Sequence, residues 1–377
     1  MKLRRITTHG NWIPEIDSLR FVAITATLLT HIMAKVYLES GKTFALSHAD
    51  FDSLMYRGGR GVPLFFAISG FILAQPFLRQ RLLHGQAVSV KAFFRRRLTR
   101  LEPPYIFSLL IYTAVLAFHS HHSSLALPLL VHIFYLNNFF HLLKINFVTW
   151  SLEVEVQFYI LAPVFGYFYA ISSTVVRRTL IVSLILASAY LQYASQGVAS
   201  QNLPGQLQFF LVGFLLADLR ATRTESTTSR WWDLVSPIVW ITIFAVPFRY
   251  ISFSLPALIL LAYLATFNGP VTRQIFRTQW IALTGGMCYS FYLMHMLVIN
   301  AAFKLTRRFV FSSSLPLSFL IQTVLLGAFI SVFCTAYFVL IERPCMDPKW
   351  PHKLWAHLSD LRNARRKPAP ETTMERR

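Results

Sequence analysis

The feature that most constrains the fold is a recurrence of long apolar stretches between residues 17 and 341 of the 377-residue chain. About 17–25 apolar residues suffice for a helix to cross the hydrocarbon core of a bilayer. By this criterion the sequence predicts ten membrane spans, at 17–38, 61–79, 102–119, 149–170, 177–194, 204–219, 233–248, 251–268, 281–303 and 316–341. We therefore expect an all-α, polytopic helical bundle that forms one domain over residues 1–344.

Composition and charge exclude several classes of protein. Only 14% of the residues are charged, whereas soluble domains are usually about a quarter charged. The net charge is +20, but the basic residues lie in short loops and tails, where they signal topology, anionic lipid or an anionic ligand rather than nucleic acid. The three cysteines show no paired spacing, so we expect neither a disulfide framework nor a metal site.

The placement of basic residues also predicts topology. Segment 125–143 is apolar but contains a proline and several polar residues, so it either spans the membrane or lies in the interface. If it does not span, the basic clusters at 177–178, 220–230 and 273–277 all fall on the cytoplasmic side with the N-terminus. Ten spans with both termini cytoplasmic is the economical prediction. The basic tail, 345–377, should form an interfacial amphipathic helix to about residue 366 and then a disordered end.

The first span carries an arginine and a histidine, Arg20 and His31. At about 100° per residue, eleven steps make three turns plus about 20°, so both side chains project from one face about 16 Å apart. Asp17 lies one turn before Arg20 and can hold it. Ionisable groups inside spans usually face the protein interior and mark a site or a pathway. The alternative is an interfacial arginine and a structural histidine.

Other spans carry further polar residues. WSLEVEVQFY begins the span at 149–170 with Glu153, Glu155 and Gln157; burying these groups is costly unless they are paired or functional. An interhelical hydrogen-bond clamp is the alternative for the two acids. Ser69–Gly70 lies in a span where small residues favour close helix packing. His295 follows Tyr292 in the span at 281–303.

With the ten-span topology, the depths of these residues can be compared. At about 1.5 Å per residue, His31 and His295 lie roughly 21 Å from the cytoplasmic ends of their helices, and Glu155 and Ser69 lie about 9 and 12 Å from the outer ends of theirs. All four fall in the outer half of a core about 30 Å thick. Arg20, Arg97 and Arg100 gather on the inner side, which indicates an anion-binding entrance there.

The residue types favour one kind of chemistry. A histidine near a carboxylate can act as a general base, with Glu155 supporting the imidazolium that forms on His31. The sequence contains neither a G-x-S-x-G elbow nor an HExxH motif, which argues against a serine hydrolase or a zinc protease. Arginine suits phosphate because its planar fork of donors matches the phosphate oxygens. A phosphate-bearing donor entering from the cytoplasm is the expected ligand.

The motifs together resemble the membrane acyltransferase 3 family of bacterial O-acyltransferases, which modify surface polysaccharides. The similar segments, in family order over nearly the whole chain, are IDSLRFVAITATLLTH (16–31), GVPLFFAISGFIL (61–73), FFRRRLTRLEPPY (93–105), WSLEVEVQFYILAP (150–163), YSFYLMH (289–295) and IERP (341–344). Two small departures, Glu102 and Met287, touch no residue on which the resemblance depends.

The resemblance implies transfer of an acyl group, commonly acetyl, from cytoplasmic acyl-CoA to a hydroxyl of an extracytoplasmic glycan, in an enzyme of class EC 2.3.1. No permanently bound cofactor is implied. The expected roles are catalysis by His31 and Glu155 and acyl-CoA binding by Arg20, Arg97 and Arg100. The expected supporting residues are Asp17, Ser69, Trp150, Gln157, Tyr292 and His295. The implied location is the bacterial cytoplasmic (inner) membrane.

Several alternatives stay open at this point. Transfer can be direct or pass through an acyl-enzyme on Ser69 or His31. The expected partners are membrane lipid and a glycan or lipid-linked saccharide acceptor, and either a separate periplasmic transferase or a second copy of the chain. A proton-coupled transporter or glycan exporter would use the same Arg, His and Glu residues, although such proteins normally show paired halves with interrupted helices. A scaffold for glycan export is a third reading.

Overall fold

The computed structural model describes residues 4–6, 12–40, 48–119, 124–140, 142–195, 201–222, 228–245, 251–311, 314–347, 350 and 359. Within these ranges all regular structure is helical, which confirms the predicted all-α class. The α-helices are α1 (Pro14–Glu39), α2 (His48–Gly58), α3 (Gly61–Arg81), α4 (Val90–His119), α5 (Ala126–Ile133), α6 (Asn137–Phe140), α7 (Trp150–Phe165), α8 (Thr174–Ala194), α9 (Leu203–Ala221), α10 (Trp231–Ala245), α11 (Ile251–Asn268), α12 (Pro270–Phe276), α13 (Gln279–Gly286), α14 (Cys288–Thr306), α15 (Leu315–Tyr337) and α16 (Arg343–Cys345). The short 3₁₀ and π turns are η1 (Phe147–Thr149), η2 (Gly166–Ala170), η5 (Arg307–Phe309) and η6 (Phe338–Glu342).

Seven helical stretches in the described part of the chain are long and apolar enough to cross a membrane. They are Pro14–Glu39, Asp50–Arg81, Val90–His119, Thr174–Ala194, Ile251–Asn268, Cys288–Phe309 and Leu315–Cys345. The polytopic helical bundle is therefore confirmed. The other three predicted spans fall on α7 with η2, on α9 and on α10. The number of crossings and the side of each terminus stay predictions, as does the interfacial helix at 345–366, most of which lies outside the described residues.

The ambiguous segment 125–143 does not form one continuous helix. It breaks into α5, of eight residues, and α6, of four, with Tyr135 at φ 57° between them. Eight residues rise only about 12 Å, which is far less than the hydrocarbon core of about 30 Å. This geometry agrees with a segment that stays near one interface rather than one that spans.

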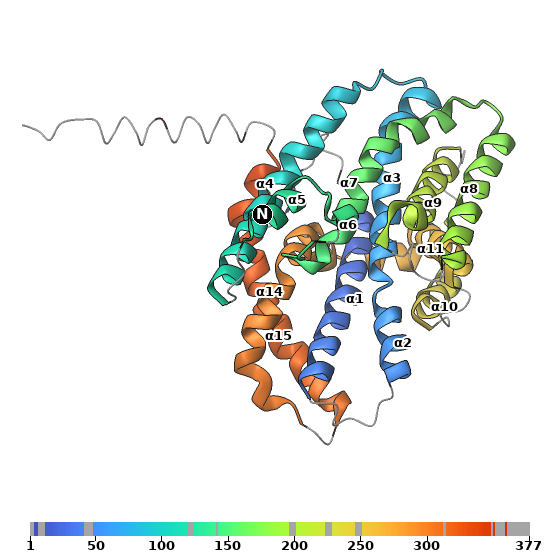
Figure 1. The fold of residues 1–377 in the computed structure, drawn as a ribbon. Coiled ribbons are helices and arrows are strands. Elements are labelled where there is room, and N and C mark those ends of the chain that lie inside the picture. The colour runs from blue at the N-terminus through green and yellow to red at the C-terminus, as the bar shows by residue number, and fades with distance from the viewer. Residues whose placement is uncertain are drawn as a thin grey trace, which may run out of the picture.

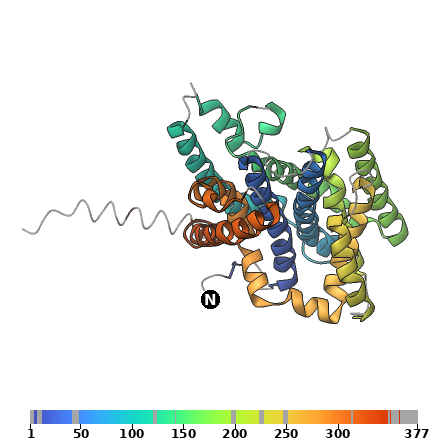
Figure 2. The ribbon, with the colours of Figure 1, turned by 90° about the horizontal axis from the view of Figure 1, so that it is seen from below.

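Two hydrophobic cores meet at α1. The first contains the start of α1 and the helices α3, α7, α8, α9, α10 and α11. The second contains the later turns of α1 together with α4, α14 and α15. Figure 1 shows α1 in the centre, with α14 and α15 on one side and α8 to α11 on the other. The same division is visible along the helix axes in Figure 2.

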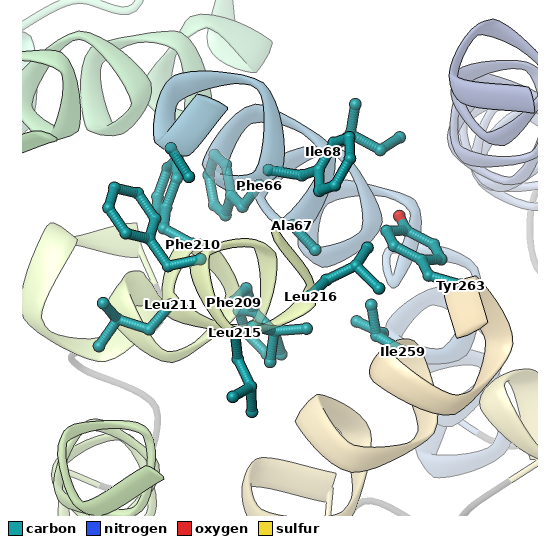
Figure 3. Close-up of a cluster of buried hydrophobic side chains, with 14 of the residues drawn as sticks. Phe66, Ala67, Ile68, Phe209, Phe210, Leu211, Leu215, Leu216, Ile259 and Tyr263 are labelled. Carbon is teal, nitrogen blue, oxygen red and sulfur yellow. The ribbon is translucent and has the colours of Figure 1, made fainter. Parts of the chain in front are cut away.

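The tightest packing in the first core is between α3 and α9. The ring of Phe66 on α3 stacks on that of Phe210 on α9 with centroids 4.5 Å apart, and Ala67 points toward α9 beside them (Figure 3). Gly70 and Gly213 allow the two backbones to approach each other: a Cβ on Gly70 would lie 2.0 Å from the carbonyl oxygen of Phe210, and one on Gly213 would lie 2.2 Å from that of Ala67. Close approach through small residues is how membrane helices gain packing. The predicted packing role of the Ser69–Gly70 pair is therefore confirmed for Gly70.

This contact yields a stability prediction. Gly213→Ala should lower the thermal unfolding midpoint in detergent, because α3 and α9 must separate to admit the methyl group; overpacking of this kind costs about 1–3 kcal/mol. Gly327→Ala in α15 is the matched control, since nothing lies within 4 Å of its Cβ position. That variant should keep or slightly raise the midpoint, because alanine favours helix. Equal midpoints for the two variants would contradict the close-packed α3–α9 contact.

Candidate active site

Asp17, on the first turn of α1, joins three donors. Its side chain is almost fully buried, and its carboxylate accepts hydrogen bonds from Arg20 Nη1 at 2.6 Å, Arg5 Nη1 at 3.0 Å and Trp12 Nε1 at 2.8 Å. Residues three apart on a helix are neighbours, so the Asp17–Arg20 pair forms as the sequence predicts. Arg5 and Trp12 precede the helix and were not assigned a role by any motif.

Arg97 and Arg100 of α4 extend this charged group. Arg97 lies over the ring of Tyr159 at 5.6 Å, and Arg100 interacts electrostatically with Arg5, Asp17 and Glu342. Arginines from the N-terminal segment, α1 and α4 thus gather near the start of α1, and their binding of an anion stays a prediction.

This group, which we call the arginine cluster, has an excess of positive charge. It consists of Arg5, Arg20, Arg97 and Arg100 with the carboxylates of Asp17, Glu155 and Glu342. Four arginines therefore face three carboxylates, so an anionic ligand would be attracted here.

Glu155 on α7 makes hydrogen bonds that differ from the sequence expectation. Its Oε1 accepts from Ser69 Oγ at 2.5 Å and from Tyr159 Oη at 2.7 Å. Tyr159 lies one turn beyond Glu155, and the guanidinium group of Arg97 lies over its ring. The carboxylate is thus directed toward α3 and the arginine cluster, and the hydrogen bonds described for it do not go to His31.

His31 instead lies beside His295 of α14. The two ring centroids are 5.1 Å apart at an interplanar angle of 35°, and the edge of Phe147 approaches His31 at 5.3 Å. His295 is fully buried. Its Nδ1 lies 2.8 Å from the carbonyl oxygen of Phe291 and 2.9 Å from that of Tyr292, whereas its Nε2 has no hydrogen-bond partner among the described residues.

This geometry fixes the tautomer of His295. Because Nδ1 contacts two acceptors, it must carry the proton, and Nε2 is left as an acceptor. A fully buried acceptor without a partner beside His31 is unusual in folded proteins, since more than about 90% of buried polar groups are satisfied. The paired rings therefore form a site that is incomplete without a further hydrogen bond. We call it the histidine pair.

Tyr292 connects the histidine pair with α7. Its hydroxyl donates to the carbonyl oxygen of Val148 at 2.6 Å and lies 3.0 Å from Ser151 Oγ. It also interacts electrostatically with Glu155. The start of α7 is thereby held against α14, which brings the predicted acidic motif and the predicted histidines into one region of the bundle.

The remaining predicted residues have structural positions. The Trp150 ring meets Phe66 edge to face at 6.4 Å, and its carbonyl oxygen accepts from Asn138 Nδ2. Gln157 is half-buried two residues beyond Glu155. In the described part of the chain no group of three or more His, Cys, Asp or Glu side chains is arranged to hold a metal ion.

Glu342 is a further site residue that the sequence alone did not single out. It ends the π turn η6 within the IERP segment, is fully buried, and accepts from the backbone N–H and hydroxyl of Ser290 at 3.0 and 2.5 Å. π turns are frequent at functional sites. The available signal was an acid at the end of a 23-residue apolar helix, where ionisable groups are rare.

Comparison with known proteins adds independent observations. Residues 13–341 match the model of the acyltransferase 3 family, described as an acyltransferase domain. Relatives include a Staphylococcus aureus protein named "Putative O-acetyltransferase", 30% identical over 166 residues that cover 41% of this chain and 24% of the relative. Another is the peptidoglycan O-acetyltransferase OatA of Listeria monocytogenes, 25% identical over 178 residues that cover 43% of this chain and 26% of the relative.

The matched part thus spans about a quarter of the length of these two relatives. No solved structure matches the chain. The family model, in contrast, covers 13–341, and within it lie Asp17, Arg20, His31, Glu155 and His295. The chain belongs to the acyltransferase 3 family.

Proposed function

We propose that the chain is an integral-membrane O-acyltransferase that moves an acyl group, acetyl in the simplest case, from acyl-CoA to a hydroxyl of a glycan or glycolipid on the opposite side of the membrane. The observation that carries the proposal is the spacing of the two groups along α1. Arg20 lies in the arginine cluster and His31 in the histidine pair, about 16 Å apart along the helix axis. Names of relatives as O-acetyltransferases support the reaction class.

The arginine cluster supplies the donor site in this proposal. Guanidinium groups bind phosphates through charge-assisted hydrogen bonds, so Arg97 and Arg100 would hold the phosphates of CoA. Arg20 is already paired with Asp17 at 2.6 Å. It would therefore add positive electrostatic potential to the donor site and help to position the donor. The thioester then extends into the bundle toward His31.

His31 acts as the general base. It takes the proton of the acceptor hydroxyl as the hydroxyl oxygen attacks the thioester carbonyl. The C–S bond then breaks, and the CoA thiolate leaves and takes this proton from His31. His295 is a positioning residue in this account: its Nε2 has no hydrogen-bond partner among the described residues, and a rotation of the His31 ring would bring the N–H of His31 to it. The other nitrogen of His31 would then face the acceptor. His295 thus takes the orienting role that the sequence reading gave to Glu155.

A two-step route is supported by a separate contact. Ser69 Oγ donates to Glu155 Oε1 at 2.5 Å, and a carboxylate in this position can receive the serine proton as Ser69 Oγ attacks the thioester carbonyl. The C–S bond breaks, and the CoA thiolate leaves and takes that proton. The acetyl group would then pass from Ser69 to the acceptor. Mass spectrometry of the protein after incubation with acetyl-CoA alone distinguishes the routes, because only the second leaves an acetyl group on Ser69.

Reconstituted protein tests the function itself. Incubation with acetyl-CoA labelled in the acetyl group should release CoA in proportion to added saccharide acceptor, with the label recovered on the saccharide. Movement of a substrate across the membrane without thioester cleavage would overturn the proposal in favour of a transporter. No cleavage and no movement, with unchanged glycan export by motif variants in cells, would favour a scaffold.

His295 provides a specific prediction within this proposal. His295→Leu should lower kcat by about a hundredfold, because misplacing a catalytic group by about 1 Å can cost that much, while KM for acetyl-CoA stays unchanged. His295→Gln keeps an acceptor and should recover part of the rate. Steady-state kinetics of both variants check this. A rise in KM without a fall in kcat, or equal rates for Leu and Gln, would contradict the positioning role.

A further inference from the structure

A second buried polar group lies in the part of the chain between α5 and α7. It consists of His132 of α5, Asn137 of α6 and Glu153 of α7, with exposed fractions of 0%, 3% and 0%. Each leaves one polar side-chain atom without a hydrogen-bond partner among the described residues: Nε2 of His132, Oδ1 of Asn137 and Oε1 of Glu153. We call these residues the outer polar group. The mechanism above uses none of them.

The fold brings these three residues together. Glu153 Oε2 accepts the backbone N–H of Asn138 at 2.8 Å, which fixes α6 against α7. Tyr105 Oη donates to the carbonyl oxygen of His132 at 2.9 Å and interacts electrostatically with Glu153. The charge of Lys144 acts on both His132 and Glu153. Asn138 thus links α6 with Glu153 of α7, and Tyr105 and Lys144 link α5 with the same carboxyl group.

All three unpartnered atoms are hydrogen-bond acceptors. His132 Nδ1 lies 2.8 Å from the carbonyl oxygen of Pro128 and must carry the proton, so Nε2 holds the lone pair. Burial lowers the pKa of His132 and keeps its ring neutral. Asn137 Oδ1 is an acceptor, and Glu153 Oε1 is one when the carboxyl group is ionised. The matching ligand is one that carries several donors in a small space, such as the hydroxyls of a sugar ring.

The segment that carries the outer polar group also contacts the histidine pair. Phe147, six residues before Glu153, meets His31 at 5.3 Å, and Asn146 Nδ2 donates to the carbonyl oxygen of Leu293 on α14 at 3.1 Å. The segment that carries the outer polar group is thus fixed beside the histidine pair. Phe147 is 43% exposed as a residue, and its ring lies next to His31.

We propose that His132, Asn137 and Glu153 form the acceptor subsite, in which they accept hydrogen bonds from hydroxyls of the sugar ring while the hydroxyl to be acylated reaches His31. The proposal rests on the acyltransferase function proposed above. It assigns substrate recognition to the α5–α6 segment, which no motif of the sequence reading covers.

The test compares two reactions of acetyl-CoA: transfer of its acetyl group to a saccharide and hydrolysis by water. Full-length protein in detergent is assayed with an oligosaccharide of N-acetylglucosamine as the probe acceptor, and separately for slow acetyl-CoA hydrolysis without it. Glu153→Gln and His132→Phe should each raise KM for the oligosaccharide at least tenfold. Hydrolysis and KM for acetyl-CoA should be unchanged, because water needs no sugar subsite.

His119→Phe is the matched control. His119 Nδ1 also bonds the carbonyl oxygen four residues earlier, Val115 at 3.0 Å, but its ring is exposed on α4. The His119→Phe variant should therefore have an unchanged KM for the oligosaccharide. The oligosaccharide should also raise the thermal midpoint of the wild-type protein and not that of Glu153→Gln, which tests the subsite even if no CoA is released.

Two results would overturn the subsite. Unchanged KM for the oligosaccharide with a lowered thermal midpoint would mean that the three atoms only bind structural water. Equal loss of oligosaccharide transfer and acetyl-CoA hydrolysis would place the residues in the chemistry or the folding rather than in acceptor recognition. If Glu153→Gln does not fold, Asn137→Ser carries the same comparison.

Discussion

His31→Ala should abolish acyl transfer while leaving the amount of folded protein and its acyl-CoA affinity close to those of the wild type. A positioned general base contributes about a hundred- to ten-thousand-fold to rate, and His31 is the one of the two paired histidines that is only partly buried. Its removal leaves the arginine cluster untouched, because Arg20 lies three turns away on α1. Initial rates and an acyl-CoA thermal shift, measured on the same preparation, check both parts.

The neighbouring polar residue Thr30 provides a matched control. Its hydroxyl bonds the carbonyl oxygen of Ala26 within the same helix at 2.8 Å, so Thr30→Ala should retain most of the activity. Loss of folded protein in His31→Ala would indicate a structural histidine instead. Retained activity would remove His31 from the mechanism.

Arg97→Gln and Arg100→Gln should each raise KM for acyl-CoA by about tenfold to a hundredfold. Hydrogen bonds to charged groups contribute about 1.5–3 kcal/mol, and each 1.4 kcal/mol corresponds to a factor of about ten in affinity. The effect on kcat at saturating donor should be small, because both residues lie in the arginine cluster rather than at the histidine pair. Michaelis curves with varied acetyl-CoA separate the two parameters.

Arg95→Gln and Arg96→Gln are charge-matched controls on the same helix. Both side chains are exposed, and their loss should change KM for acyl-CoA by less than twofold to threefold, as for weakly coupled surface charges. A fall in kcat at unchanged KM for Arg97→Gln and Arg100→Gln would contradict donor binding by these residues. The same shift for all four variants would indicate a general charge effect instead of a site.

Much of the fold can be predicted from the sequence because membrane spans are recognisable by their length and hydropathy. The all-α bundle, the first span and the Asp17–Arg20 pair depend on local spacing along one helix. Pro128, Asn137 and Asn138 make segment 125–143 ambiguous in the sequence, but the break itself lies after Ile133 and was not predicted. The predicted features need no knowledge of how one helix faces another.

The contacts between helices were harder to predict. Depth alone placed His31, His295, Ser69 and Glu155 at one level, but depth does not say which helix faces which. The rotation of α7 about its axis directs Glu155 to Ser69 and Tyr159, and α14 brings His295 to His31. The hydrogen bonds described for Glu155 therefore do not go to His31, and its support of the imidazolium stays a prediction.

Two charged residues of the site, Arg5 and Glu342, were not identified from the sequence. Arg5 precedes the first helix, and Glu342 lies at a π turn that no hydropathy pattern reveals. Both become visible only when the arginine cluster is assembled from five separate parts of the chain. A basic N-terminus is ordinarily explained by topology, which is why Arg5 attracted no functional prediction.

Sided transfer in sealed proteoliposomes tests the central claim most directly. Acetyl-CoA carrying a labelled acetyl group is supplied on one side of oriented vesicles, and the saccharide acceptor is present only on the other. With the donor at the face that bears Arg97 and Arg100, labelled ester should accumulate on the acceptor across the membrane, and His31→Ala should prevent it. Ester formation only when donor and acceptor share one side would contradict a reaction path that runs through the bundle from the arginine cluster to the histidine pair.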